Sequence, residues 1–285
     1  FTVLTIVQKR ALERHINGAV VFNGVAALPQ VVVAAVILLL TPPDWTSTAV
    51  VIMLAAGVVQ ATVWLLQGYA INREADISRI VPVLDSHPLL VLIIAVMVLG
   101  EALTPLKWVA VLMVIAGAIT ASWHQALPGE RIRLNRSFFA VLGAAVAMAV
   151  VTVLFKVASA DLTVVQMVGL AWMVSAPIHL IIARVTHSGR EMRKVLGSRD
   201  AMRMLSATQL AFVVAIFSGT LALTLGPVSL ATAIMGTRPV MLLLWVVISG
   251  FSVRDALRHR PEHGGMRNKW ASASLVTVGV AVMAF

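Results

Sequence analysis

Apolar runs of bilayer-spanning length recur along the whole chain, and they constrain its fold more than any other feature. Each run is close to the roughly 20 residues that a helix needs to cross the hydrocarbon core. Of 285 residues, 60% are apolar and 12% are charged, and that charged fraction is about half of what soluble domains carry. We therefore predict an all-α polytopic membrane protein. The predicted spans are Ala19–Leu40, Ala49–Ala70, Ile77–Leu99, Trp108–Trp123, Phe138–Ala158, Val164–Ile182, Leu205–Leu225, Val228–Gly250 and Trp270–Phe285.

The first twelve residues, Phe1–Leu12, are too short to span. Because the chain opens on Phe rather than Met, we interpret them as the tail of a first helix whose start is missing. The prediction is then ten transmembrane helices, without a cleavable signal peptide. The chain has no cysteine, which excludes a disulfide framework and thiolate chemistry.

The basic residues behind the net charge of +10 follow the predicted membrane topology and do not form a patch that could bind nucleic acid. The loops after predicted helices 1, 3, 5, 7 and 9 hold 19 of the 22 Lys and Arg residues, whereas the other loops hold only Lys107 and Lys156. Arg238 lies inside predicted helix 9. This asymmetry is the positive-inside pattern, which places the odd loops in the cytoplasm and both termini outside. Basic residues beside the membrane can also contact anionic lipid headgroups.

The two halves of the chain resemble each other in the order of their Gly, Ser and Pro residues. An offset of 151 aligns Gly68 with Gly219, Ser78 with Ser229, and Pro88 with Pro239. Other matches pair the region of Pro29 with that of Pro177, and Lys107, Trp108 and Gly117 with Lys269, Trp270 and Gly279. We predict two five-helix repeats, residues 1–125 and 136–285. Since five is odd, the second repeat is inverted, which is typical of transporters that bind substrate at mid-membrane depth.

A series of short motifs follows in the first half: Ser78-Arg79, the mid-helix Pro88, Leu99-Gly-Glu101, Lys107-Trp108 and Gly117. Together these residues resemble the end of an EamA domain of the drug/metabolite transporter superfamily. The second half keeps the proline and the final glycine but has Ile248-Ser-Gly250 in place of Leu-Gly-Glu, so it is a weaker match. The resemblance implies a ten-helix exporter or metabolite carrier with no cofactor. It implies cytoplasmic termini, whereas the charge pattern predicts external ones. Glu101 would cap or fix the turn.

Three ionisable residues are predicted near the centres of their spans, where charge is costly and therefore faces a cavity or a partner. One interpretation is that Asp85 and Arg238 face each other across a central cavity and bind the two ends of a zwitterion, with His87 or Asp85 carrying a coupling proton. The other is a permanent ion pair between predicted helices 4 and 9, with His87 a packing residue. Pro88 and Pro239 each remove a helical hydrogen bond and are predicted hinges.

Helix 3 carries a polar stripe that is predicted to line a pore. Gln60, Trp64 and Gln67 share one face, and Tyr69 lies nearby on the same helix. The alternative role is hydrogen bonding between helices, which contributes only about 0.6 kcal/mol on average. For Gln166, Trp172, His179 and Gln209 we favour packing over a role in binding.

No nucleophile elbow, zinc motif, P-loop or dinucleotide motif appears, so we expect neither an enzyme nor ATP-driven transport by this chain alone. His259 and His263 flank Pro261 in a basic loop and are not expected to bind metal. We interpret the chain as a secondary transporter or exporter of small polar metabolites, amino-acid-like or amphiphilic, in the cell inner membrane. The alternatives are a translocase of lipid-linked or nucleotide sugars and a non-transporting scaffold subunit. Expected partners are a small-molecule substrate and membrane lipids, with a homodimer or a partner subunit left open.

Overall fold

The computed structural model describes residues 16, 18–73, 84, 87–102, 104–123, 136–235, 274–275, 278–279 and 282. The regular structure within these residues is helical, with no strand. The helices are α2 (Ala19–Leu40), α3 (Thr48–Arg73), α5 (His87–Leu99), α6 (Pro105–Trp123), α7 (Arg136–Ala158), α8 (Val164–Val185), α9 (Gly189–Gly197), α10 (Arg199–Leu225) and α11 (Val228–Met235).

The predicted apolar spans coincide with these helices wherever the structure describes them. Helix α2 has the bounds that the sequence predicts, whereas α10 begins at Arg199 instead of Leu205. This earlier start is set by polar groups: the Ser198 hydroxyl accepts a hydrogen bond from the Ala201 amide at 3.3 Å, and Asp200 lies in the first turn. A carboxylate near a helix N-terminus is favourable because of the helix dipole. Hydropathy detects the membrane-buried part of such a helix but not its polar extension.

The loop predicted between the seventh and eighth spans contains a short helix, α9. The sequence analysis missed it because its residues are mostly polar and it is only 9 residues long. Val195 is nevertheless buried, and it packs with Val21, Phe22 and Val25 of α2. The amphipathic pattern, with one apolar side against α2 and charges on the other, is what makes this segment helical.

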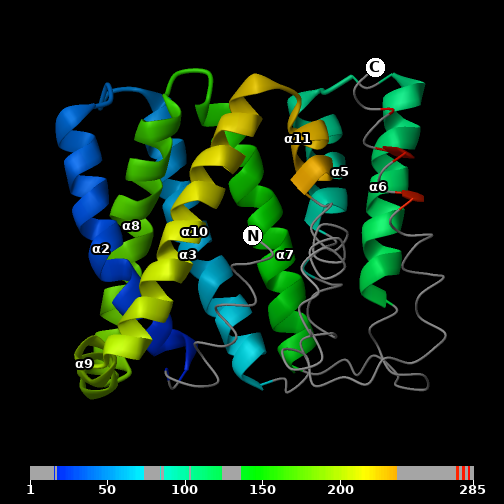
Figure 1. Ribbon diagram of the computed structural model, residues 1–285. Helices are drawn as coiled ribbons and strands as arrows, with labels where there is room; N and C mark the ends of the chain where they lie inside the picture. The colour runs from blue at the N-terminus through cyan, green and yellow to red at the C-terminus, as the bar shows by residue number, and fades with distance from the viewer. Residues whose placement is uncertain are drawn as a thin grey trace.

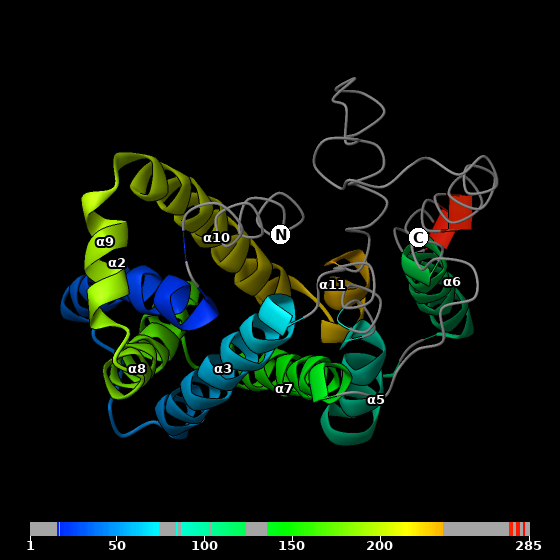
Figure 2. The same ribbon diagram turned by 90° about the horizontal axis from the view of Figure 1, so that it is seen from below.

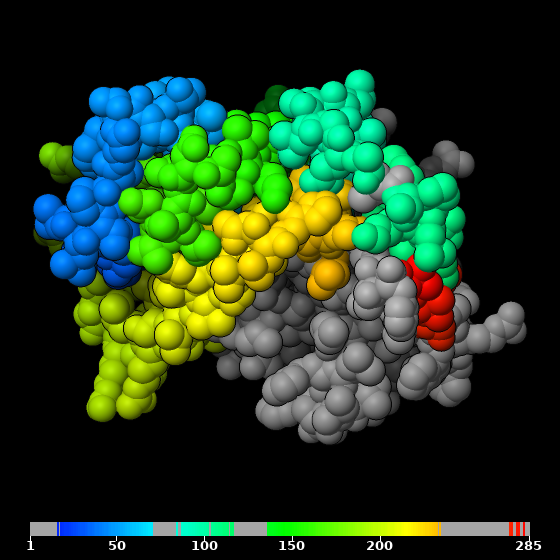
Figure 3. Space-filling model, turned by 90° about the horizontal axis from the view of Figure 1, so that it is seen from above, coloured from blue at the N-terminus to red at the C-terminus, as the bar shows by residue number. Residues whose placement is uncertain are grey.

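The long helices run side by side in alternating directions, as Figure 1 shows. The connections after α2, α5, α7 and α10 lie at the upper end in this view, whereas α9 lies at the lower end. Seen from below, α9 crosses beside α2 and α8 and leads into α10 (Figure 2). From above, atoms of α7, α8 and α10 fill the space between the α2–α3 pair and the α5–α6 pair (Figure 3).

Five described helices are long and apolar enough to cross a membrane: α2, α3, α7, α8 and α10. Helix α5 is a shorter apolar helix. Large apolar side chains remain exposed on their outer faces, among them Leu39 (80%), Met97 (79%) and Leu210 (68%). Exposed apolar surface of this extent indicates contact with lipid rather than water. The prediction of a polytopic membrane protein is confirmed; the count of ten helices and the inverted repeat stay predictions.

Small residues allow the helices to approach closely. A Cβ on Gly57 of α3 would lie 2.8 Å from the Ala171 carbonyl oxygen of α8, and one on Gly169 of α8 would lie 2.7 Å from the Ile37 side chain of α2. Close backbone approach at small residues is how membrane helices gain packing energy, because lipid is as apolar as the helices themselves. Helix α8 is thereby held between α2 and α3.

Charged side chains join the helix ends at the upper end of the molecule. The Glu101 carboxylate accepts hydrogen bonds from the Val228 amide at 2.6 Å and from the Ser229 amide and hydroxyl at 3.2 and 2.6 Å. It therefore caps the first turn of α11, where a negative charge is stabilised. Lys156 of α7 donates to the carbonyls of Leu223 and Gly226 at 2.9 and 2.7 Å, at the C-terminus of α10.

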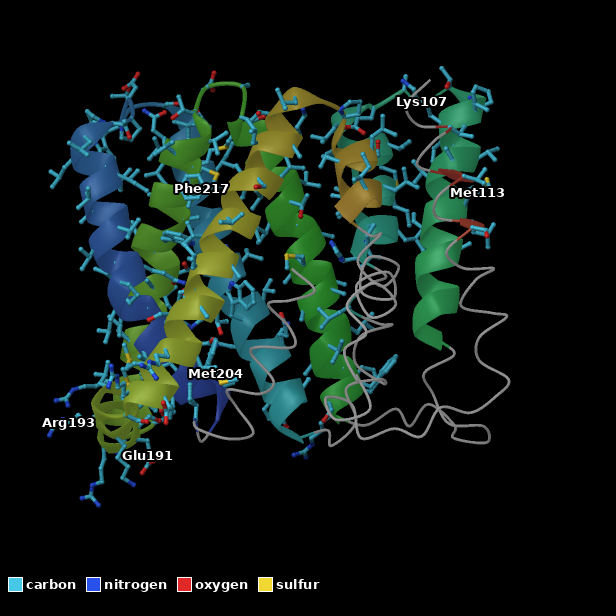
Figure 4. All side chains as sticks on the ribbon, viewed as in Figure 1. Lys107, Met113, Glu191, Arg193, Met204 and Phe217 are labelled. Atoms are coloured by element: carbon cyan, nitrogen blue, oxygen red, sulfur yellow. The ribbon has the colours of Figure 1, made fainter. Side chains whose placement is uncertain are left out.

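The two ends of the molecule differ in charge. Among the described side chains, the Lys and Arg residues at the upper end are Lys107 (Figure 4) and Lys156. The segment from the end of α8 through α9 to the start of α10, at the lower end, carries six others. These are Arg184, Arg190, Arg193, Lys194, Arg199 and Arg203. The charge asymmetry of the sequence thus becomes a difference between two ends of the structure.

Candidate substrate cavity

A cavity of about 30 Å³ lies among four helices, α2, α3, α8 and α10. Two of these helices belong to the first predicted repeat and two to the second. Its walls combine hydrogen-bonding side chains with aromatic rings. The lining residues are Phe22, Asn23, Ala26, Gln30, Gln60, Trp64, Trp172, Ser175, His179, Thr208, Gln209 and Phe212.

Two polar atoms in the wall are buried and find no partner within the described part of the chain. Gln60 and His179 are each 5% exposed, and neither Gln60 Oε1 nor His179 Nδ1 has a hydrogen-bond partner among the described residues. Leaving a buried polar atom unpaired costs about 1–3 kcal/mol, so such atoms are rare unless they meet water or a ligand. Both atoms belong to side chains that line the same cavity, which makes it the best candidate for a binding site.

Other polar side chains of the wall bind one another across helix boundaries. Gln30 of α2 donates its amide N–H to Gln209 Oε1 of α10 at 3.2 Å. Asn23 of α2 donates to the Trp64 carbonyl of α3 at 3.3 Å. The Gln30–Gln209 bond joins the predicted repeats directly, so it must break or lengthen if the two halves separate at this point.

Aromatic rings form the apolar part of the wall. Trp64 of α3 meets Phe212 of α10 edge-on, with ring centroids 5.2 Å apart, and Trp172 of α8 stacks on Phe212 at 6.0 Å. Trp172 also meets Phe217 edge-on at 6.3 Å, and Figure 4 shows Phe217 on α10. Ring contacts of this kind contribute about 0.5–1.5 kcal/mol each beyond their buried area. The aromatic cluster therefore holds α3, α8 and α10 together beside the polar groups.

The predicted polar stripe of helix 3 divides between the cavity and the surrounding packing. Gln60 and Trp64 line the cavity, whereas Gln67 (9% exposed) and Tyr69 are not among its lining residues. Tyr69 packs beside Ala70 and Val141, in the contact of α3 with α7. The face that the sequence predicts therefore includes the cavity but extends past its lower boundary.

His87 and Pro88 lie at the start of α5, away from the cavity lining, and both are buried. His87 Nδ1 donates to the Leu84 carbonyl at 2.9 Å, since a carbonyl oxygen can only accept. Pro88 has no amide hydrogen to bond this carbonyl four residues earlier, and the imidazole takes that place. The contact supports packing as the role of His87. Asp85, Arg238 and Pro239 lie outside the described residues.

Several cavity residues were not predicted to bind substrate. Asn23 and Gln30 lie seven residues apart on one face of α2, a spacing that would have indicated them. Trp172, Ser175 and His179 of α8 are three and four residues apart and Thr208 and Phe212 of α10 are four apart, so each set also shares one helix face. Packing was favoured for Trp172, His179 and Gln209, yet all three line the cavity. What the sequence could not show is that these helix faces converge.

Comparisons with known proteins agree with the fold. One solved structure, described only as "Crystal structure of protein", has a TM-score of 0.69 and 14% sequence identity to this chain; the match covers 99% of this chain and 93% of the other. At this identity the likeness concerns the fold alone. No curated protein matches the sequence. The family model described as "EamA-like transporter family" matches residues 1–123. Residues 1–123 are therefore similar to the EamA-like transporter family of the drug/metabolite transporter superfamily, and the apolar helices of the described residues are those of a polytopic membrane protein.

Proposed function

We propose that this protein is a secondary transporter that exports small polar metabolites, amino-acid-like or amphiphilic, by alternating access. The observation that carries the proposal is the pair of unpaired buried atoms, Gln60 Oε1 and His179 Nδ1, in a cavity between helices of both halves. A solute that donates or accepts hydrogen bonds would satisfy both atoms on binding. A permanent packing contact would have no reason to leave them unpaired.

The chemistry of the wall favours solutes with neutral polar groups and an apolar body. Amides, hydroxyls and an imidazole supply hydrogen bonds, while Trp64, Trp172 and Phe212 supply flat apolar surface. No Asp, Glu, Lys or Arg is among the described lining residues. We assign the charged ends of a zwitterion to Asp85 and Arg238, which would exchange their mutual ion pair for the substrate, and Asp85 would carry a coupling proton.

Transport requires the cavity to expand. Ligand pockets usually measure several hundred cubic ångströms, and at about 30 Å³ this cavity has room for only a few waters. We propose that residues 1–125 and 136–285 rock against each other as inverted repeats. Pro88 and Pro239 are the proposed hinges, and Pro29 and Pro177 lie within α2 and α8, which border the cavity.

The proposed orientation in the cell inner membrane places the lower, basic end in the cytoplasm and the C-terminus outside. A fluorescent protein that matures only in the cytoplasm, fused to the C-terminus, should stay dark. A fluorescent fusion would show that the protein has the opposite orientation, and the assignment of the cavity would not change.

The proposal is tested in proteoliposomes that contain the purified full-length protein. The labelled solutes are tryptophan, glutamine and threonine, which are neutral overall, compared with lysine and aspartate. We expect saturable uptake of at least one neutral solute, its loss in Arg238→Gln, and its retention in Arg199→Gln, which makes the same charge change at an exposed site. Uptake that survives Arg238→Gln would remove Arg238 from the site. If none of these solutes is taken up and none raises the melting temperature of the protein, the result would favour a non-transporting scaffold subunit over a transporter of these solutes.

A further inference from the structure

A basic hollow of about 430 Å³ lies at the lower end of the molecule, between the last turns of α8 and helix α9. Four basic side chains line it: Arg184, His187, Arg190 and Arg193. Its floor is apolar and includes Met192 of α9, and no Asp or Glu is among the described lining residues. Figure 4 shows Arg193 at this end of the structure, directed away from the long helices.

Among the described residues, no acid neutralises the cations of the hollow. The acids of this segment are engaged elsewhere, because Glu191 pairs with Lys194 at 2.6 Å and Asp200 lies 3.8 Å from Arg203. Within the described part of the chain, no carboxylate oxygen lies within 4.0 Å of a nitrogen of Arg184, Arg190 or Arg193. Three arginines that share one hollow repel each other, so an anion that bridges them would be favourable. Their planar guanidinium groups are suited to phosphate oxygens.

The turn that forms the hollow has an unusual residue at its centre. The Ser188 amide bonds the Ala183 carbonyl at 2.9 Å and the His187 amide bonds the Arg184 carbonyl at 3.1 Å, as in a Schellman motif. The central position of this motif is left-handed and usually glycine, whereas here it is His187, with φ 54°. A glycine would adopt this backbone with less strain. The histidine instead adds an imidazole to the wall of the hollow.

The depth of the hollow identifies the kind of anion. Arg184 lies in the last turn of α8, a helix long enough to span the bilayer, so the hollow is at headgroup level. On the same end of α8, Ile181 and Val185 are 61% and 70% exposed, and they offer apolar surface to acyl chains. We propose that this hollow is a binding site for the phosphate headgroup of an anionic phospholipid.

The bound lipid would act on the substrate cavity through α9. Met192 of α9 contacts the region of Gly24 on α2, where a Cβ would lie 3.1 Å from the Met192 sulfur. The neighbouring Phe22 lines the cavity and also packs with Val195 of α9. Helix α9 thus packs against the segment of α2 that carries Phe22, and an anion that fixes α9 against α8 would hold this wall of the cavity in place.

The site is tested by native mass spectrometry of the purified full-length protein titrated with the anionic lipid POPG, the zwitterionic lipid POPC, or inorganic phosphate. We expect retention of POPG but not POPC, and about tenfold weaker POPG binding in Arg184→Gln/Arg190→Gln, because two charge-assisted contacts are lost. The control Arg199→Gln/Arg203→Gln removes the same charge from the next helix and should bind POPG like the wild type. His187→Gly should weaken POPG binding about threefold without lowering the melting temperature.

Three outcomes would overturn the proposal. Equal loss of binding in both double variants would show a diffuse attraction between a basic surface and anionic lipid instead of a built site. Equal retention of POPC would show contact with acyl chains only. Displacement of POPG by equimolar inorganic phosphate would assign the hollow to a soluble anion. The measurement does not depend on what the central cavity transports, so it succeeds or fails independently of the proposed function.

Discussion

Replacing Gln60 with Leu should make the protein more stable and a poorer transporter. The side chain is 5% exposed, and its Oε1 atom has no partner among the described residues. An unpaired buried polar atom costs about 1–3 kcal/mol, and an apolar side chain of similar size avoids that cost. We therefore expect Gln60→Leu to raise the free energy of unfolding by up to about 3 kcal/mol.

The same substitution should weaken substrate binding by about one hydrogen bond. A hydrogen bond of net value about 0.5–1.5 kcal/mol corresponds to roughly two- to tenfold in affinity. The assay pairs thermal unfolding in detergent with the half-saturation concentration for uptake into proteoliposomes, using the solute that the wild type transports. A gain in stability together with a loss of affinity indicates a binding role. Replacing a residue that only packs helices together would instead lower the stability of the protein.

Gln209→Leu is the matched control for this experiment. It removes the acceptor of the 3.2 Å bond from Gln30 and leaves that amide unpaired. Stability should therefore fall by about 0.5–1.5 kcal/mol, opposite in sign to Gln60→Leu. If Gln60→Leu instead lowers stability by a similar amount and leaves uptake unchanged, Gln60 is a packing residue and the reasoning from its unpaired oxygen is refuted.

The other contacts predict stability changes that thermal unfolding can measure. Glu101→Gln should destabilise the protein by about 1–3 kcal/mol, because the charge that caps α11 is lost; no change would mean that α11 does not need this cap. Lys156→Met should cost a similar amount, since the ammonium group binds the carbonyls that end α10, and an unchanged melting temperature would contradict that role. Gly57→Ala should cost about 1–3 kcal/mol by forcing α3 and α8 apart. Gly197→Ala, whose Cβ would meet nothing within 4 Å, should be nearly neutral, and equal effects of the two would refute the close approach.

The sequence alone predicts the membrane class and most helix bounds, because spanning helices are set locally by length and apolarity. The agreement for α2 shows this clearly. The sequence also indicates Gln60 and Trp64 as candidate cavity residues. Together with Gln67 they place three large polar-capable side chains on one helix face, which is unusual for a face that contacts lipid. The EamA resemblance depends on short local motifs and is confirmed by the family model over residues 1–123.

The tertiary structure determines which faces meet, and no local pattern contains that information. Asn23, Ser175, His179 and Gln209 become cavity residues only because α2, α3, α8 and α10 converge. Glu101 was expected to fix its own turn, yet it caps a helix that begins 127 residues later. Hydropathy is a sum over neighbours in the chain, whereas capping and cavity formation depend on pairs of residues that are distant in sequence. The physical reason is that membrane helices associate through close packing and polar contacts between helices, and these are decided by the partner surface.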